Sequence, residues 1–118
     1  ERDAKMGWGD LYEDALVGLH AQLAKDLQRN PLEMAFVIGR LSDFDMNNKK
    51  YPHWKKVRLA QIKVANSNPK YFWIDTDDLN DGLNRKGKQI TNDLHYSAEG
   101  YKILGKRFAQ ACLIAIGK

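Results

Sequence analysis

Apolar residues recur at helical spacing near the start of the chain. Leu16, Leu19, Leu23 and Leu27 are separated by three or four positions, which predicts an amphipathic helix with one apolar stripe. The preceding segment 10–13, Asp-Leu-Tyr-Glu, has the pattern of a capping box, in which the first and last side chains bind backbone N–H groups. We therefore expect the helix to begin at 10 and to end near 30–31, Asn-Pro.

Two further segments have the same helical period. The pattern predicts a helix over about residues 54–66, with Val57, Ala60 and Val64 on its apolar side. Ser97 is a favourable N-cap for a third helix. Its buried stripe is expected to contain Tyr101, Leu104, Phe108, Ala111, Cys112 and Ala115.

Between the helices lie two short segments, 34–38 and 71–74, that are apolar at every position. They are too short for helices and show no alternation, which favours parallel strands covered on both faces. The order α-β-α-β-α predicts an α/β fold in which the two strands are neighbours or near neighbours. Two strands do not complete such a sheet, so we expect a missing segment or another chain to cover its edges.

The composition is that of a globular protein. A length of 118 residues fits one domain, and 43% hydrophobic with 29% charged residues argues against disorder. No apolar run approaches the roughly 18 residues of a membrane span, so no membrane partner is expected. The single cysteine, Cys112, excludes an internal disulfide and is expected in the core. Residues 1–4 do not resemble a natural start, so the lack of a signal peptide leaves localisation open, and a secreted or periplasmic parent fits.

The chain is basic, with a net charge of +4 and a pI near 9.2. Its lysines are spread over helix faces and loops, which indicates solvation, and no nucleic-acid partner is expected. An alternative function is a non-catalytic module that holds an anionic polymer and whose binding weakens steeply with salt. Its basic surface would consist of Lys49, Lys50, Lys55, Lys56 and Arg58.

Candidate chemistry gathers after the two predicted strands, because ligands of open α/β sheets bind beyond the carboxyl ends of the strands. Ser42 and Asp43 follow the first strand and are expected to line the cleft and contact substrate. His95 lies two residues before the N-cap Ser97, where loop and helix together can hold a general base. Asp93 is the nearest carboxylate in sequence and is a candidate to orient the ring. The alternative is a purely structural role, in which His95 only caps or packs at the start of the helix.

Three other patterns are less informative. Ser42 is not expected to be a nucleophile, because the turn around such a serine needs small flanking residues. The polar segment 75–92 is expected as one long loop, and its start is acidic, with Asp75, Asp77, Asp78 and Asp81. This acidic loop does not fit an EF-hand, because Leu79 and Lys88 fall on ligand positions, and we expect a solvated turn without metal. Tyr51, Trp54 and Trp73 present aromatic groups suited to stacking on a sugar, although Trp73 is more simply the core of a strand.

The segment 92–101, with 104–105 and 107–109 after it, resembles the last motif block of the sialate O-acetylesterase-like branch of the SGNH hydrolases. Segments 39–44 and 73–79, together with Trp54, residues 57–58 and residues 60–61, are also similar to this branch, so the resemblance covers most of the chain. It implies a three-layer α/β/α sandwich, a flavodoxin-like arrangement of which residues 1–118 form the carboxy-terminal portion.

The resemblance implies a carbohydrate acetylesterase with His95 as catalytic base and no cofactor. The family's serine belongs to an early Gly-x-Ser block, which we expect to precede Glu1 together with a Gln-Gly-Glu segment. In the wider superfamily an aspartate stands three residues before the histidine, where this chain has Asn92. The supporting acid is therefore Asp93 or a glutamate upstream, and the acetylated sugar is sialic acid, xylan or another glycan.

Overall fold

A computed structural model describes residues 1–117. The elements are α1 (Arg2–Met6), α2 (Gly9–Asp26), β1 (Phe36–Gly39), α3 (Trp54–Ala65), β2 (Tyr71–Ile74), β3 (Gly82–Leu83), β4 (Gln89–Ile90) and α4 (Ala98–Ala115). The predicted alternation of helices and strands is confirmed, although β1 begins two residues later than expected. The short helix α1 and the pair β3–β4 were not predicted. Among these residues, no helix is both long and apolar enough to cross a membrane.

The two predicted strands form a parallel pair. Phe36 lies opposite Tyr71 and Gly39 opposite Ile74, so β1 and β2 run side by side over their whole length. A parallel pair needs a crossover, and α3 provides it. The prediction of neighbouring parallel strands is therefore confirmed.

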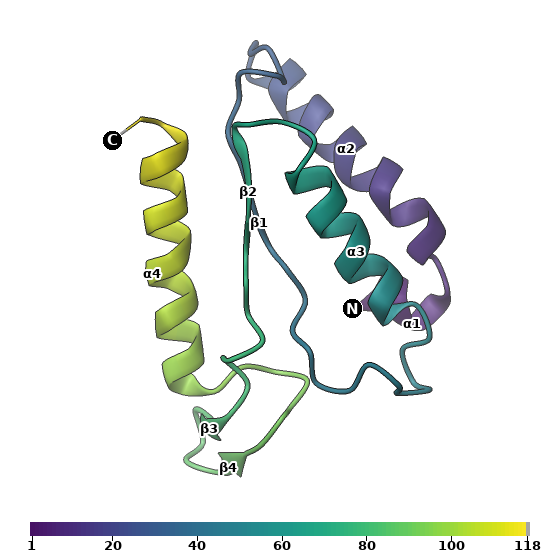
Figure 1. Cartoon of the computed structure of the whole chain (residues 1–118), viewed down its shortest axis with the longest axis vertical. Helices are drawn as coiled ribbons and strands as arrows, with labels where there is room; N and C mark the ends of the chain where they lie inside the picture. The colour runs from purple at the N-terminus through teal and green to yellow at the C-terminus, as the bar shows by residue number, and fades with distance from the viewer. Residues whose placement is uncertain (118) are drawn as a thin grey trace.

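Helices cover both faces of this pair (Figure 1). Helix α4 packs against β1 and β2 on one side, while α3 contacts them on the other and α2 packs beside α3 on that same side. Ile38 on β1 meets Val64 and Ala65 on α3 in one buried cluster. The chain is thus a mixed α/β structure with a short parallel sheet between helices.

Helix α2 differs from its prediction in both its start and its buried face. It begins at Gly9, and the ring of His53 caps it by accepting a hydrogen bond from Gly9 N at 3.0 Å. The proposed capping box is wrong, because the Asp10 carboxylate binds Lys56 instead. The stripe is also wrong in part, since Leu16 packs inward but Leu19, Leu23 and Leu27 are exposed. The buried positions of α2 are Gly9, His20 and Ala24.

Helix α4 begins as expected but buries less than expected. The hydroxyl of Ser97 accepts a hydrogen bond from Gly100 N at 2.9 Å, which confirms Ser97 as the N-cap. A side chain at Gly100 would overlap the backbone carbonyl of Leu79, so only glycine lets the first turn approach this closely. Cys112 is exposed and Tyr101 is 53% exposed, so placing these two in the core was wrong.

The segment expected as one polar loop contains the antiparallel pair β3–β4, with Gly82 opposite Ile90. Its turn is fixed by Asn84, whose side-chain oxygen accepts hydrogen bonds from the backbone of Lys86 and Lys88. Gly87 has a φ of 75°, a conformation that glycine adopts at little cost. The hairpin lies near the amino end of α4 (Figure 1).

Candidate active site

Three loops meet beyond the carboxyl ends of β1 and β2, and Asn80 joins them. Its side chain is 1% exposed and donates hydrogen bonds of 3.0 Å to the backbone carbonyls of both Asp43 and Asp93. The Asn80 carbonyl in turn accepts from Asp93 N at 3.2 Å. Asn80 therefore ties the loop after β1 to the loop that carries His95.

His95 projects from this junction toward solvent. Its side chain is 67% exposed, and its backbone N donates to the Asp93 carboxylate at 2.9 Å. Its Nδ1 lies 3.8 Å from Asp93 Oδ1, beyond hydrogen-bond length, and within residues 1–117 neither ring nitrogen has a hydrogen-bond partner. A histidine with this exposure and no core partner is free to exchange a proton with a bound group.

The ring borders an open hollow of about 490 Å³. Its walls come from the β3–β4 hairpin, the segment before α4 and the first turn of that helix. The lining residues are Asn84, Arg85, Lys86, Ile90, Asp93, His95, Tyr96 and Tyr101. The hollow therefore brings the candidate base together with charged and aromatic side chains that were not predicted to meet it.

Asn92, three residues before His95, has a structural role. Its amide binds the backbone carbonyl of Phe44, and its φ of 48° places it in the left-handed region. The side chain is thus directed to the loop after β1. Asp93 is the carboxylate nearest the His95 ring in the described chain, and its support of that ring stays a prediction.

Ser42 and Asp43 lie in the adjoining loop but not in the hollow beside His95. Ser42 is 2% exposed, and its carbonyl accepts a hydrogen bond from the Trp54 indole at 2.7 Å. Asp43 is partly buried and donates its backbone N–H to Asp77 Oδ1 at 2.7 Å. Their proposed contact with substrate stays a prediction.

The acidic loop after β2 forms an ion-pair network rather than the solvated turn expected from its sequence. Arg40, whose side chain is 8% exposed, binds both Asp75 and Asp77. Arg58 makes two hydrogen bonds to Asp77, at 2.7 and 3.0 Å. On the outer side of the loop, Arg107 pairs with Asp78. This network fixes the loop from which Asn80 is presented.

The arginines set the protonation of Asp77. Burial favours the neutral acid, but hydrogen bonds from Arg58 and the Asp43 backbone, with the charges of Arg58 and Arg40, outweigh it and lower the pKa of Asp77. The same pairing raises the pKa of Arg58 against the opposing effect of its burial. Asp77 is therefore a structural anion at neutral pH.

The tyrosines of the hollow were not identified from the sequence. Tyr96 is half-buried, and burial raises the pKa of its phenol above the ordinary value. Its ring meets that of Tyr101 edge to face, with centroids 5.3 Å apart. The helical period of apolar residues placed Tyr101 in the core, and nothing in the sequence indicated that its side chain is exposed in the first turn of α4. Tyr51 and Trp54, which were considered for sugar stacking, are 4% and 2% exposed and belong to the core.

The alternative basic surface is weaker than its sequence suggests. Lys56 pairs with Asp10, and the guanidinium of Arg58 is 12% exposed and bound to Asp77. Two of its five cations are therefore already neutralised.

In the part of the chain that the structure describes, no three His, Cys, Asp or Glu residues are grouped so that they could hold a metal ion.

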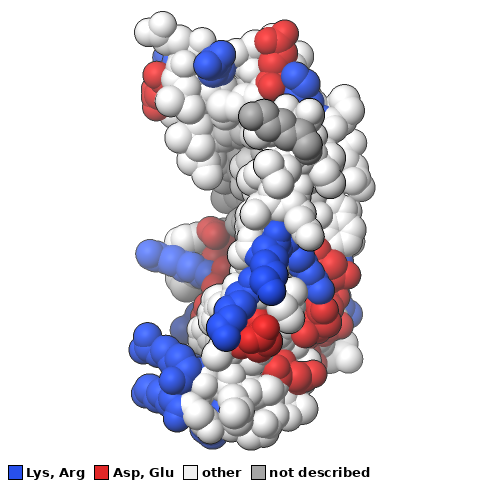
Figure 2. All heavy atoms as spheres, turned by 90° about the vertical axis from the view of Figure 1, so that its left-hand side faces the viewer, with Lys and Arg blue, Asp and Glu red and all other residues white. Residues whose placement is uncertain are grey.

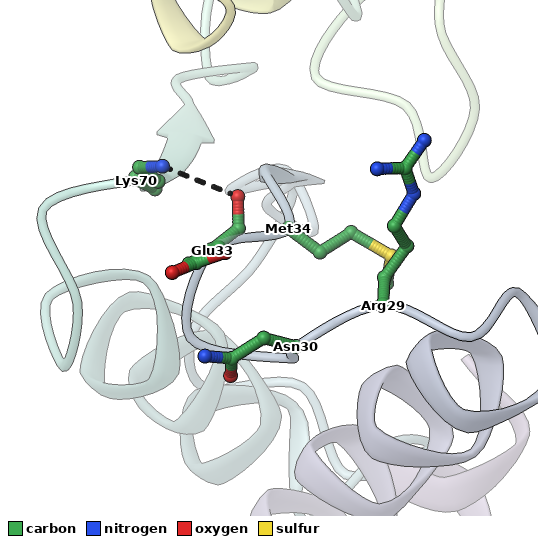
Figure 3. Close-up of a pocket in the computed structure, with 5 residues that line it drawn as sticks. All are labelled: Arg29, Asn30, Glu33, Met34 and Lys70. Atoms are coloured by element: carbon green, nitrogen blue, oxygen red, sulfur yellow. Dashed lines mark hydrogen bonds between the residues drawn. The ribbon is translucent and has the colours of Figure 1, made fainter.

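A second hollow, of about 280 Å³, lies just before β1 and β2 (Figure 3). Arg29, Asn30, Glu33, Met34 and Lys70 line it, and the Lys70 ammonium is directed to the Glu33 carbonyl at 3.4 Å. It lies at the amino ends of the strands, opposite the end where open α/β sheets bind ligands. The hollow beside His95 is the better candidate site.

Removal of the Asn80 amide is expected to loosen the site. Asn80→Ala leaves the Asp43 and Asp93 carbonyls without their donor, and we expect the free energy of unfolding to fall by about 2 kcal/mol. Hydrogen exchange at the His95 amide is expected to accelerate. Denaturant unfolding and NMR exchange measure both effects.

Asn66→Ala is the matched control, because Asn66 is exposed and its side chain has no hydrogen bond within the described chain. Equal effects of the two substitutions would show that Asn80 does not hold the loops together.

Comparison with known proteins identifies a family. The family model described as "Carbohydrate esterase, sialic acid-specific acetylesterase" matches residues 1–114. No curated protein and no solved structure gives a significant match. The match spans nearly the whole chain and includes the parallel strands β1 and β2, the loops that meet at Asn80, and His95. The chain therefore belongs to the carbohydrate esterase family of sialic acid-specific acetylesterases.

Proposed function

We propose that this chain supplies the catalytic base, His95, to a larger esterase that removes O-acetyl groups from carbohydrates. The observation that carries the proposal is the placement of His95, exposed at the rim of a hollow beyond the carboxyl ends of the parallel strands. Membership of the acetylesterase family supports the reaction class. A complete three-layer α/β/α sandwich in the larger enzyme is part of this proposal.

The proposed reaction uses a serine from outside these 118 residues. The serine hydroxyl attacks the acetyl carbonyl while its proton passes to Nε2 of His95. The protonated ring then gives that proton to the departing sugar oxygen, which leaves an acetyl-serine. Water, deprotonated by the same ring, releases acetate and restores the serine.

The serines of the chain are engaged elsewhere. Ser42 is buried, and Ser97 caps α4. The Ser67 hydroxyl donates to the Val64 carbonyl at 2.7 Å. This supports a nucleophile from another segment or chain, as do the exposed leucines of α2, which such a segment could cover.

Asp93 is proposed to orient the His95 ring. A small rotation of either side chain would bring Nδ1 and Oδ1 from 3.8 Å to hydrogen-bond length. The carboxylate would then stabilise the imidazolium that forms when His95 accepts the serine proton. An upstream glutamate remains the other candidate for this role.

The isolated chain is expected to hydrolyse 4-nitrophenyl acetate no faster than free imidazole at equal concentration. A base without a positioned nucleophile and oxyanion hole loses most of the catalytic gain. Release of nitrophenolate measures the rate. Ser42→Ala is the control, and robust turnover that disappears in this variant would contradict the proposal.

A further inference from the structure

We propose that His53 and Gly9 form a pH-sensitive latch, which holds the start of α2 against α3 while the His53 ring is neutral and releases it in mild acid. The ring accepts a hydrogen bond from Gly9 N through Nδ1 at 3.0 Å. Only the neutral ring has a lone pair for this bond, because both nitrogens of an imidazolium are donors. The cap of α2 therefore depends on a side chain type that changes charge between about pH 5 and 8. This inference concerns the fold and does not rest on the role of His95.

His53 joins three helices. It is the N-cap residue of α3, and its backbone N–H donates to the Ala4 carbonyl of α1 at 3.1 Å. Its ring binds the first residue of α2, 44 positions earlier in the chain. The starts of α2 and α3 lie side by side next to α1 (Figure 1). The charge of one ring therefore acts on all three helices at their junction.

The contact between the ring and α2 is close and has no local substitute. A Cβ at position 9 would lie 2.8 Å from His53 Cβ and 3.0 Å from Nδ1, so only glycine lets the ring approach this closely. The N-cap residue of α2 is Trp8, whose indole donates but cannot accept a hydrogen bond. The Asp10 carboxylate binds Lys56. Neither neighbour of Gly9 therefore replaces the ring as the acceptor.

Protonation of the ring would oppose this contact twice. A proton on Nδ1 would face the N–H of Gly9, so two donors would meet at 3.0 Å. The amino end of a helix also carries a partial positive charge, which disfavours a cation there. The ring would then turn away and leave the Gly9 N–H without its acceptor.

The charged side chains beside the ring do not offset this repulsion. From α2 and α3 they are Asp10 and Lys56, and both carboxylate oxygens of Asp10 lie 2.8 Å from Lys56 Nζ. This pair has no net charge with which to stabilise an imidazolium. Helix α1 meets His53 through the uncharged carbonyl of Ala4. Within residues 1–117, the histidine that pairs with a carboxylate is His95, not His53.

The junction that the latch closes has an apolar interior. Ala4 of α1 is fully buried, and its cluster also contains Tyr51, Trp54 and Val57. Release of α2 from the His53 ring would loosen the helices that cover this cluster. The opening is local, because α4 and the pair β1–β2 pack on one another without His53.

The test is amide hydrogen exchange of the ¹⁵N-labelled 118-residue chain, followed by NMR at about pH 7.5 and about pH 5. Protection factors correct for the intrinsic effect of pH on exchange and report local opening. We expect protection of the Gly9 amide to fall roughly five- to tenfold in acid, the loss that corresponds to an N-cap. Asp10 stays ionised in this range, because its hydrogen bond from Lys56 lowers the pKa of the carboxyl.

Two substitutions separate a latch from a simple contact. His53→Asn keeps an acceptor oxygen near the position of Nδ1 but does not titrate, so protection of Gly9 is expected to be the same at both pH values. His53→Ala removes the acceptor, and protection is expected to be low at both. His95→Gln is the matched control, because His95 is an exposed histidine outside the junction. It is expected to show the same fall in acid as the wild type.

Acid also raises the positive charge of the whole chain, and basic side chains already gather at the end that carries β3 and β4 (Figure 2). The Gly100 amide, which Ser97 caps, is the internal reference for this general effect, and its protection is expected to stay constant. Constant protection of Gly9, an equal fall at Gly9 and Gly100, or the same fall in His53→Asn would overturn the inference. The measurement needs no substrate, so its failure would leave the proposed function untouched.

Discussion

His95→Ala in an intact parent enzyme is expected to lower kcat by about four orders of magnitude or more. In the proposed mechanism the histidine takes the serine proton in the attack and gives it to the sugar oxygen, so both steps would lose their proton carrier. The members of such a triad act as a unit, so the loss of one removes most of the rate enhancement that the whole triad provides. Steady-state hydrolysis of an acetylated sugar by the parent, with its own serine present, measures the effect.

Asp93→Asn separates the two candidates for the supporting acid. If Asp93 orients the ring, kcat is expected to fall by a large factor, approaching that of the histidine variant. If an upstream glutamate has this role, the loss is expected to be small. Circular dichroism shows whether each variant is folded.

Lys106→Gln in the parent is the matched control, because Lys106 does not line the hollow beside His95. Its kcat is expected to stay that of the wild type. Retention of full activity by His95→Ala would remove His95 from the mechanism. It would then leave His95 as a residue that only packs at the start of α4.

The parallel pair was predictable because it depends on local composition. Segments without a polar position, too short for a helix and separated by a helical crossover, have few alternatives to neighbouring parallel strands. The N-cap of α4 was predictable for the same reason, since Ser97 binds a backbone N–H only three residues away. In each case the deciding contacts are close in sequence or imposed by topology.

The cap of α2 was not predictable, because it comes from a distant residue. His53 is 44 positions from Gly9, and its ring replaces the side chain of Asp10 in binding the first turn. Asp10 is instead drawn to Lys56 on α3. A short sequence pattern identifies a possible local cap but not a competing tertiary partner.

The exposed leucines of α2 show a second limit. A helical period identifies an apolar stripe but not what covers it. In this chain α2 packs through Leu16, His20 and Ala24, and the ring of His20 stacks on Phe36 with centroids 4.5 Å apart. Leu19 and Leu23 meet nothing that buries them within the described residues.

The sequence singles out His95 as a candidate base, a role that stays a prediction, but it does not identify the residues that hold the surrounding loops. His95 stands out because a histidine before a helix N-cap follows a long polar segment and belongs to a recognisable motif. Asn80 does not stand out, because asparagines are common in turns and its two carbonyl partners lie 37 and 13 positions away. The β3–β4 hairpin was missed because two-residue strands carry no periodic signal.

Asp77→Asn is expected to lower the free energy of unfolding by about 2–3 kcal/mol at neutral pH. The substitution removes the anion shared by Arg40 and Arg58, whose side chains are only 8% and 12% exposed, and leaves their charges poorly compensated. Asp75 still pairs with Arg40, and Asp77 itself is 36% exposed, so the loss stays below that of a fully buried pair. Denaturant unfolding measures the change.

The same contacts predict an acid dependence. The pKa of Asp77 is lowered in the folded chain, so its stabilising contribution is present above its unfolded pKa of about 3.9 and is lost as the pH falls through the folded pKa. Stability of the wild type is therefore expected to decline below about pH 4. Asp77→Asn should decline less steeply in that window, because it has no proton to bind there.

Asp78→Asn is the matched control for the loss of stability at neutral pH. It is the neighbouring aspartate and also pairs with an arginine, but its side chain is 62% exposed and that of Arg107 is 32% exposed. Exposed pairs of this kind contribute under about 1 kcal/mol. If the two variants lost the same stability at neutral pH, the network around Asp77 would be a surface feature. The loop that carries Asn80 would then depend on its backbone and on Asn80 itself rather than on the buried arginines.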